Sequence, residues 1–142
     1  PILFQHQPGQ MPNCKAILIL FAVVHITFSA IPCNIDVMMD SKSSKKFRVD
    51  VVVPSLGVKA DNMIFTTKEE KKKIKIEGKD CDTQKWLIQT FKPVGDSEEW
   101  EKVGNISAKM FGTGEMHVEI FENLQPHLMA RRGIWCTEGN CY

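Results

Sequence analysis

The sequence predicts an all-β domain: an antiparallel β-sandwich of about seven strands, immunoglobulin-like or similar. Apolar residues alternate with polar ones at a period of two through most of the chain after residue 32. Short turn-forming segments separate these runs, which favours hairpins over the long crossovers of βαβ units. Four cysteines fall in the same part of the chain and fit a small domain stapled by disulfides.

An apolar run precedes the domain and is typical of a secretory signal. Ala16–Val24 is continuously apolar and follows the basic residue Lys15. A membrane span needs about 20 such residues, whereas the core of a signal peptide needs only about 7–15. Small residues near Ser29 predict cleavage after it, which leaves a mature N-terminus at Ala30 or, if cleavage slips by one, at Ile31.

The chain therefore divides into three parts. Residues 1–10 precede an initiator-like Met11 and are interpreted as a leader or cloning remnant. Residues 11–29 form the predicted signal peptide, and residues 30–142 form a single secreted domain with room for one core. No second apolar run long enough to span a membrane follows.

Charge is balanced in the predicted mature chain. The whole chain has 18 basic and 17 acidic residues. Removal of residues 1–29 takes away one basic residue, Lys15, and no acidic residue. The resulting formal charge of zero gives no electrostatic reason to expect nucleic acid or an anionic membrane as a partner. We expect a monomer rather than an oligomer.

The strands are expected at residues 33–39, 47–53, 63–65, 74–77, 85–91, 116–121 and 134–136. The run 85–91 is apolar on both faces, as expected of a central strand. The inward positions of these runs predict the buried core: Phe47, Val49, Val51, Val53, Ile74, Ile76, Trp86, Ile88, Val118 and Ile120.

Two segments lack this alternation. Residues 94–114 are polar and interrupted by glycines, and we interpret them as a long connection. Residues 125–133 predict a short helix near the C-terminus, because Pro126 is suited to the start of a helix and Gly133 to its end.

The four cysteines of the mature chain allow three disulfide pairings. Four consecutive hairpin-linked strands would return Cys81 to the end of the domain where Cys33 begins, so we favour Cys33–Cys81. Cys136 and Cys141 enclose "TEGN", which can form the turn of a small ring. The main alternative bonds Cys136 to Cys81 or to Cys33.

Three clusters suggest chemistry, and each has a simpler interpretation. The basic run 68–78 suggests heparin or nucleic-acid binding, but glutamates flank its lysines as on a solvated hairpin. Glu115, His117 and Glu119 share one face of a strand and suggest a metal site, although any polar outer face has this pattern. His127 with the last two cysteines suggests zinc, but disulfides are the usual outcome in a secreted chain.

No catalytic motif is present. The sequence has no GxSxG elbow, no HExxH pair and no phosphate-binding glycine loop, so we expect no enzyme, no catalytic residue and no cofactor. Asn105, followed by Ile106 and Ser107, is an acceptor for N-glycosylation in the predicted exposed connection.

The mature chain resembles the nematode family of secreted clade V proteins. The resemblance rests on Cys33, "FRVDVVVPS" (47–55), "KKIKIEGKDC" (72–81), "KWLIQTF" (85–91), "GTGEMHVEIFE" (112–122) and "ARRGIWC" (130–136). These motifs are strand faces, turns and cysteines, so the resemblance implies an extracellular domain without an assigned biochemical role. It also implies release at the interface with a host or the environment.

For function, the sequence favours a secreted interaction module that binds an extracellular protein, for example of a host, through its surface. The alternative is a carrier of a lipid or another small apolar molecule, which requires a cavity lined by Met39, Val51, Phe65 and Ile120. Inhibition of a protease through an exposed loop within residues 94–110 is a third hypothesis.

Overall fold

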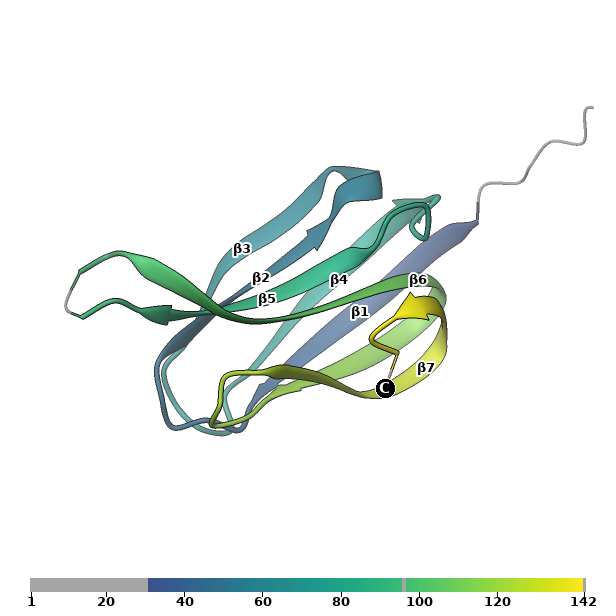
Figure 1. The fold of residues 1–142 in the computed structure, drawn as a ribbon. Coiled ribbons are helices and arrows are strands. Elements are labelled where there is room, and N and C mark those ends of the chain that lie inside the picture. The colour runs from purple at the N-terminus through teal and green to yellow at the C-terminus, as the bar shows by residue number, and fades with distance from the viewer. Residues whose placement is uncertain (1–30, 96, 142) are drawn as a thin grey trace, which may run out of the picture.

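The computed structural model describes residues 31–95 and 97–141, which form seven strands and one short 3₁₀ helix (Figure 1). The predicted leader, signal peptide and cleavage site lie outside these residues. The elements are β1 (Pro32–Ser41), β2 (Phe47–Val53), η1 (Pro54–Leu56), β3 (Val58–Phe65), β4 (Lys71–Lys79), β5 (Trp86–Pro93), β6 (Trp100–Ile120) and β7 (Pro126–Gly139).

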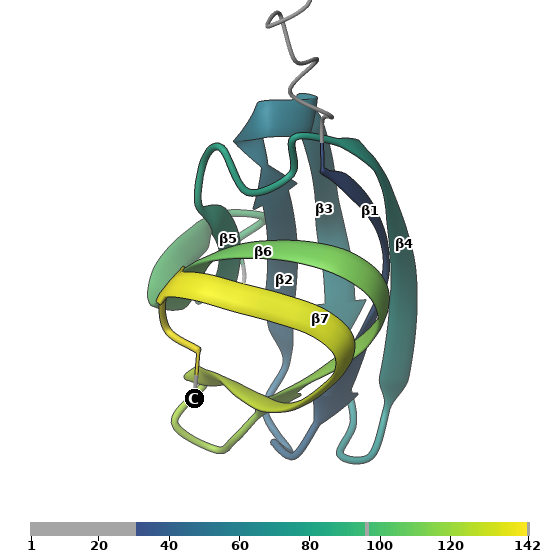
Figure 2. The same ribbon diagram turned by 90° about the vertical axis from the view of Figure 1, so that its right-hand side faces the viewer.

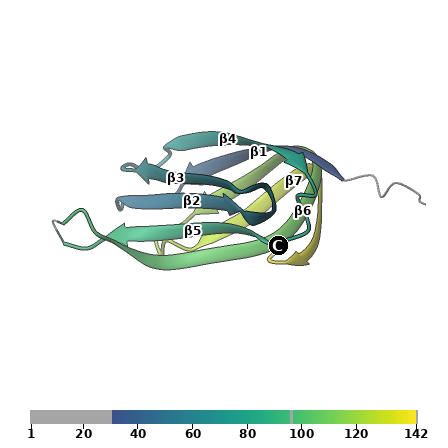
Figure 3. The ribbon, with the colours of Figure 1, turned by 90° about the horizontal axis from the view of Figure 1, so that it is seen from above.

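The strands form one mixed sheet that curls into a nearly closed barrel (Figures 2 and 3). The order is β3-β2-β5-β6-β1-β4, with β7 paired to β6, and the barrel stays open between β3 and β4. This confirms the prediction of an all-β domain of seven strands. The prediction that all pairs are antiparallel is wrong, because β1 and β6 run parallel, from Cys33 beside Gly112 to Ser41 beside Ile120.

Strand β6 explains why one curled sheet forms where a sandwich of two sheets was expected. It is 21 residues long, and its first half pairs with β5. Its second half lies between β1 and β7. Ala108 pairs with Trp86 of β5 and also with Gly139 of β7, so β5 and β7 lie on opposite sides of β6 at this point.

The predicted long connection over residues 94–114 is wrong for most of its length, because β6 begins at Trp100. The glycines that suggested a loop allow the chain to approach its neighbours closely. A Cβ atom on Gly104 would lie 2.8 Å from Thr90 Oγ1, and one on Gly114 (φ +154°) would lie 1.9 Å from the carbonyl oxygen of Arg132. These glycines therefore mark tight packing within a strand.

The predicted short helix over residues 125–133 is also wrong, because all of these residues after Gln125 belong to β7. Pro126 and Leu128 are buried and pair with Ile120 and Val118 of β6. Gly133 (φ +70°) does not end a helix. It lets β7 bend against β6, where a Cβ atom would lie 2.1 Å from the carbonyl oxygen of Thr113.

The core agrees closely with the sequence. Ile74 is half-buried and packs against the core, and the other predicted core residues are all buried. Phe47 and Phe65, from the paired strands β2 and β3, stack with ring centroids 4.9 Å apart. Burial of such side chains stabilises the domain by roughly 1.5–3 kcal/mol each before the entropy of ordering is counted.

Both favoured disulfides are present, Cys33–Cys81 and Cys136–Cys141, with Cα–Cα distances of 6.1 and 5.8 Å. The antiparallel pair of β1 and β4 returns the chain from Pro32 to its partner Lys79, which brings Cys81 to Cys33. The two consecutive strands β1 and β2 are not neighbours in the sheet, but the chain reversals place the thiols as predicted.

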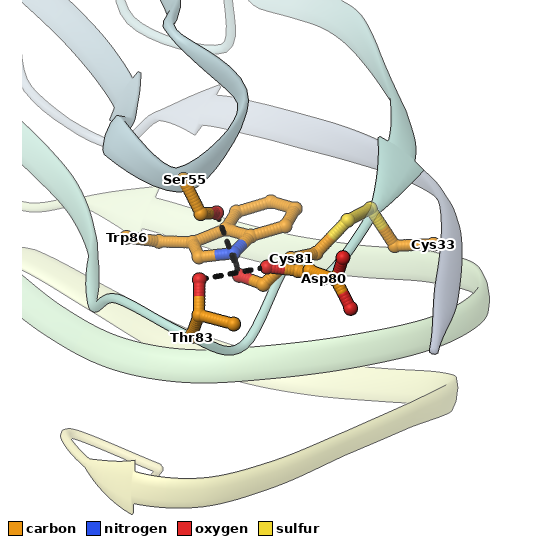
Figure 4. The surroundings of a disulfide bond; sticks show 6 residues. All are labelled: Cys33, Ser55, Asp80, Cys81, Thr83 and Trp86. Carbon is orange, nitrogen blue, oxygen red and sulfur yellow. Dashed lines mark hydrogen bonds between the residues drawn. A yellow bond between two sulfur atoms is a disulfide. The ribbon is translucent and has the colours of Figure 1, made fainter. Parts of the chain in front are cut away.

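The Cys33–Cys81 disulfide lies beside the indole of Trp86 at one end of the barrel (Figure 4). The Trp86 Nε1–H donates to the carbonyl oxygen of Cys81 at 2.7 Å, and the Ser55 hydroxyl donates to the same oxygen at 3.3 Å. Because Trp86 is fully buried, this bond satisfies a polar atom that burial would otherwise penalise.

Candidate functional site

Two large hydrophobic side chains stand exposed on β7. Trp135 is 69 % exposed and Met129 is 54 % exposed, and no other large hydrophobic residue of the described chain exceeds these fractions. We call these two side chains, with the hollow between them, the β7 surface. An exposed tryptophan on a small domain is a feature of binding surfaces.

The hollow between them has a volume of about 760 Å³. It is lined by Leu128, Met129, Ala130, Arg131, Ile134, Trp135, Cys136 and Cys141. Leu128 and Ile134 are buried and join this lining to the core, whereas Met129 and Trp135 are exposed. The lining thus combines apolar side chains with one arginine, the mixture that is common in binding sites.

The path of β7 creates this hollow. In Figure 2, β7 curves in front of the barrel beside β6, and the C-terminal residues turn back from its end. Among the described strands, β7 pairs only with β6, so its other edge is unpaired. Its pairing with β6 shifts register at three places, and such irregularities discourage the addition of another strand. The hollow and the side chains, more than the strand edge, are therefore available for recognition.

Ion pairs and hydrogen bonds stabilise the C-terminal end of β7. Glu138 contacts Lys85, the residue before β5, at 2.8 Å and Lys109 of β6 at 2.9 Å. Hydrogen bonds from these two lysines lower the pKa of Glu138 to about 2. Asn140, just beyond the strand, accepts from the Ser107 N–H and donates its own N–H to the Ser107 carbonyl oxygen. The end of β7 that follows Trp135 is therefore tied to β6 and to the residue before β5.

The three residues that suggested a metal site, Glu115, His117 and Glu119, have ion-pair partners as neighbours. Glu115 lies 3.6 Å from Arg132 and 3.9 Å from His117, and Glu119 lies 3.7 Å from Lys42. They share the outer face of β6, as the sequence predicts, but no three acidic, histidine or cysteine side chains of the described chain are grouped to hold a metal ion. This face is a network of surface ion pairs.

The basic run lies on β4, at the end of the sheet order. Lys71 pairs with Asp40 at 3.5 Å, Lys73 pairs with Asp36 at 2.8 Å, and Lys75 pairs with Glu77. Acidic side chains of β1 and β4 therefore balance its positive charge. This arrangement supports the solvated hairpin more than a polyanion site.

The zinc hypothesis required Cys136 and Cys141 as thiolate ligands, and these thiolates are not available. Cys136 and Cys141 are bonded to each other, and disulfide sulfurs do not act as zinc ligands. His127 instead packs edge-on against Phe121, with ring centroids 5.3 Å apart.

Asn105 lies on β6, opposite Gln89 of β5, and not in a loop. Its side chain is exposed, while the following Ile106 packs against the core. The glycosylation acceptor is therefore on the outer face of the barrel.

Sequence reasoning missed a buried ion pair on β2. Arg48 and Asp50 alternate with the inward positions of the predicted strand 47–53, yet Asp50 is 4 % exposed and its carboxylate lies 3.2 Å from Arg48 Nε. The Arg48 guanidinium covers Phe91 at 4.2 Å, and the Asn62 N–H (φ +60°) donates to Asp50. This cluster stabilises an irregularity in the pairing of β2 and β3.

The sequence contained one signal for the β7 surface. Alternation within the predicted strand 134–136 places Trp135 opposite to Ile134 and Cys136, and therefore outward. Nothing in the local sequence indicates the hollow, because it requires the bend of β7 and the return of Cys141.

No protein-family model matches the chain, and no curated protein matches it. Across residues 31–95 and 97–141 there is no helix with the length and apolar character that crossing a membrane would demand.

Proposed function

We propose that this protein acts outside the cell as an interaction module and that its partner, an extracellular protein, binds the β7 surface. The observation that carries the proposal is the exposure of Trp135 and Met129 beside an apolar hollow. Aromatic side chains at such places supply most of the binding free energy in many interfaces.

The extracellular location is part of the proposal. The two disulfides fit an oxidising compartment, and the apolar run before residue 30 fits a cleaved signal peptide. The resemblance to nematode secreted clade V proteins suggests release toward a host or the environment. An extracellular location and release toward a host or the environment both agree with an interaction module, and neither implies a chemical reaction.

The carrier hypothesis has weaker support. Met39, Val51, Phe65 and Ile120 are fully buried and belong to one packed core. None of them lines any of the three surface hollows found in the described chain. A bound lipid would therefore need the β7 hollow, and native mass spectrometry of secreted protein would show its mass.

The inhibitor hypothesis also has weaker support. Most of residues 94–110 belongs to strand β6, so only the short turn before Trp100 resembles an exposed loop. A protease-binding loop needs an extended exposed segment, and a tight turn offers little of one.

Paired variants test the proposal. Trp135→Ser with Met129→Ser removes the β7 surface, and Ile64→Ser with Val94→Ser is the matched control, because Ile64 (36 %) and Val94 (41 %) are also exposed hydrophobic residues. Wild type and both variants are immobilised and exposed to extracellular fluids of candidate hosts, and the retained proteins are quantified by mass spectrometry.

The proposal predicts a protein retained by wild type and by the control variant but lost from the β7 variant. Retention that is equal in all three, or lost equally in both variants, contradicts the assignment of the surface. Circular dichroism and thermal melting of each variant show whether the fold is intact.

A further inference from the structure

A second surface of the molecule carries a modification signal. Asn105-Ile106-Ser107 has the composition of an N-glycosylation acceptor, and the Asn105 side chain is exposed on β6. We propose that Asn105 carries an N-linked glycan and that this glycan covers the outer face of β5. The inference rests on the proposed secretion, because the donor sugar is available only in the secretory pathway.

The pairing of β5 and β6 defines what the glycan would cover. Asn105 lies directly opposite Gln89, which makes Leu87 its diagonal neighbour on the same face. Phe91 lies on that face of β5 too, just beyond a shift in the register after Thr90. Diagonal partners on one face of a sheet lie about 7–8 Å apart, within reach of the first sugar ring. Leu87 and Phe91 are half-buried although they point away from the core. The Arg48 guanidinium lies 4.2 Å from the Phe91 ring, so the apolar surface left to cover is Leu87 and the part of Phe91 that remains exposed.

The acceptor side chains do not hold the fold together. Within the described residues, Asn105 makes no side-chain hydrogen bond, and Ser107 bonds to Asn140 only through its backbone N–H and carbonyl oxygen, at 2.9 and 2.8 Å. The Asn105 amide and the Ser107 hydroxyl are therefore free for a modifying enzyme to recognise while the chain is still extended.

The reaction balances with a co-reactant of the secretory pathway, a lipid-diphosphate-linked oligosaccharide. The amide nitrogen Nδ2 of Asn105 forms a bond to the anomeric carbon of the first sugar. The bond between that carbon and the phosphate oxygen breaks, the lipid diphosphate leaves, and one amide proton is released. No oxidant or reductant is required.

The position of the glycan also agrees with a free β7 surface. Phe111, which is the partner of Trp135, lies six positions after Asn105 on β6. This spacing corresponds to roughly 20 Å along an extended strand. The sugar therefore covers the apolar surface of β5 and leaves Trp135 accessible to a partner.

The experiment expresses the full chain in secreting eukaryotic cells and maps peptides from medium and cells with and without peptide N-glycosidase. In wild type, and in Ser107→Thr, the Asn105 peptide is expected to carry sugar that the enzyme removes, converting Asn105 to Asp. In Ser107→Ala and Asn105→Gln that sugar mass is expected to be lost.

The alternative outcomes are distinguishable. An unmodified Asn105 in secreted protein overturns the glycan but not secretion, whereas an unmodified chain confined to the cytosol overturns both.

Hydroxyl-radical oxidation tests whether the glycan covers β5. Removal of the sugar should raise the oxidation of Leu87 and Phe91 and leave the oxidation of Trp135 unchanged. Equal oxidation at Leu87 and Phe91 before and after removal overturns the coverage of β5.

Discussion

Strands β1–β5 and the ribbon of β6 and β7 are built differently. In β1, β2 and β5 alternate side chains enter the core, and the Cys33–Cys81 bond ties the first strand to the segment before β5. The β6–β7 ribbon has shifted register, glycines with positive φ, and an exposed Trp135. The first region therefore contributes most of the buried core side chains, and the ribbon carries the proposed binding surface.

The largest effect is expected in the first region. Val51 is fully buried on β2, and Val51→Asp should prevent secretion of folded protein, because an unpaired charge in an apolar core costs several kcal/mol. Val52→Asp is the matched control, because Val52 is half-buried on the outer face, where water reaches the charge. Normal yield and unchanged melting of Val51→Asp would mean that the register of β2 is different.

The disulfide of the first region should stabilise the fold more than the disulfide of the ribbon. The chain-entropy model assigns about 4 kcal/mol to a loop as long as the Cys33–Cys81 separation of 48, and about 2 kcal/mol to the Cys136–Cys141 separation of 5. Replacing both cysteines of the first pair with serine should lower the melting temperature more than replacing both of the second. A larger loss of melting temperature from the second replacement would mean that the Cys136–Cys141 disulfide of the ribbon stabilises the fold more.

Glycines test the bend of the ribbon. Gly133 (φ +70°) and Gly57 (φ +62°) have similar backbones, but a Cβ atom at Gly133 would contact the Thr113 carbonyl oxygen, whereas one at Gly57 has open space around it. Alanine at either position should cost about 1–3 kcal/mol in backbone strain. Gly133→Ala should cost more, as urea unfolding would measure. Equal costs would mean that β6 and β7 separate easily at the bend.

The smallest effect concerns the ion pairs at the end of the ribbon. Because Lys85 and Lys109 lower the pKa of Glu138 to about 2, its contribution to stability is complete above its ordinary pKa of 4.5 and is lost as the pH falls toward 2. Wild type should melt slightly above Glu138→Gln at pH 7, and the difference in melting temperature should shrink as the pH falls to 2, where about half of the Glu138 carboxyls are protonated. A difference at pH 2 as large as at pH 7 would assign the effect to packing.

The same comparison shows why the sequence predicted one region better than the other. Alternation identified β1, β2 and the central strand β5, because each strand buries one or both faces regularly. In the ribbon, Gly104, Gly114 and Gly133 suggested a loop and the end of a helix, since a glycine needed for close approach is identical in sequence to one in a turn.

Long-range features had no local signal. The parallel pairing of β1 with β6 joins segments far apart in the chain, and no residue pattern in either strand specifies it. The burial of the Arg48–Asp50 pair had no local signal either, because the aromatic rings of Phe91 and Trp100 that lie near the guanidinium come from other strands. The disulfides were predictable because they depend on the number of chain reversals.

The most direct test of the ribbon as the binding surface is photocrosslinking from position 135. A photoreactive phenylalanine analogue replaces Trp135 in one sample and Ile64, the exposed hydrophobic residue on β3, in another. After irradiation in extracellular fluid, a crosslinked protein is expected from position 135 and not from position 64. The same crosslinked protein from both positions, or from position 64 alone, would contradict the assignment of binding to the ribbon.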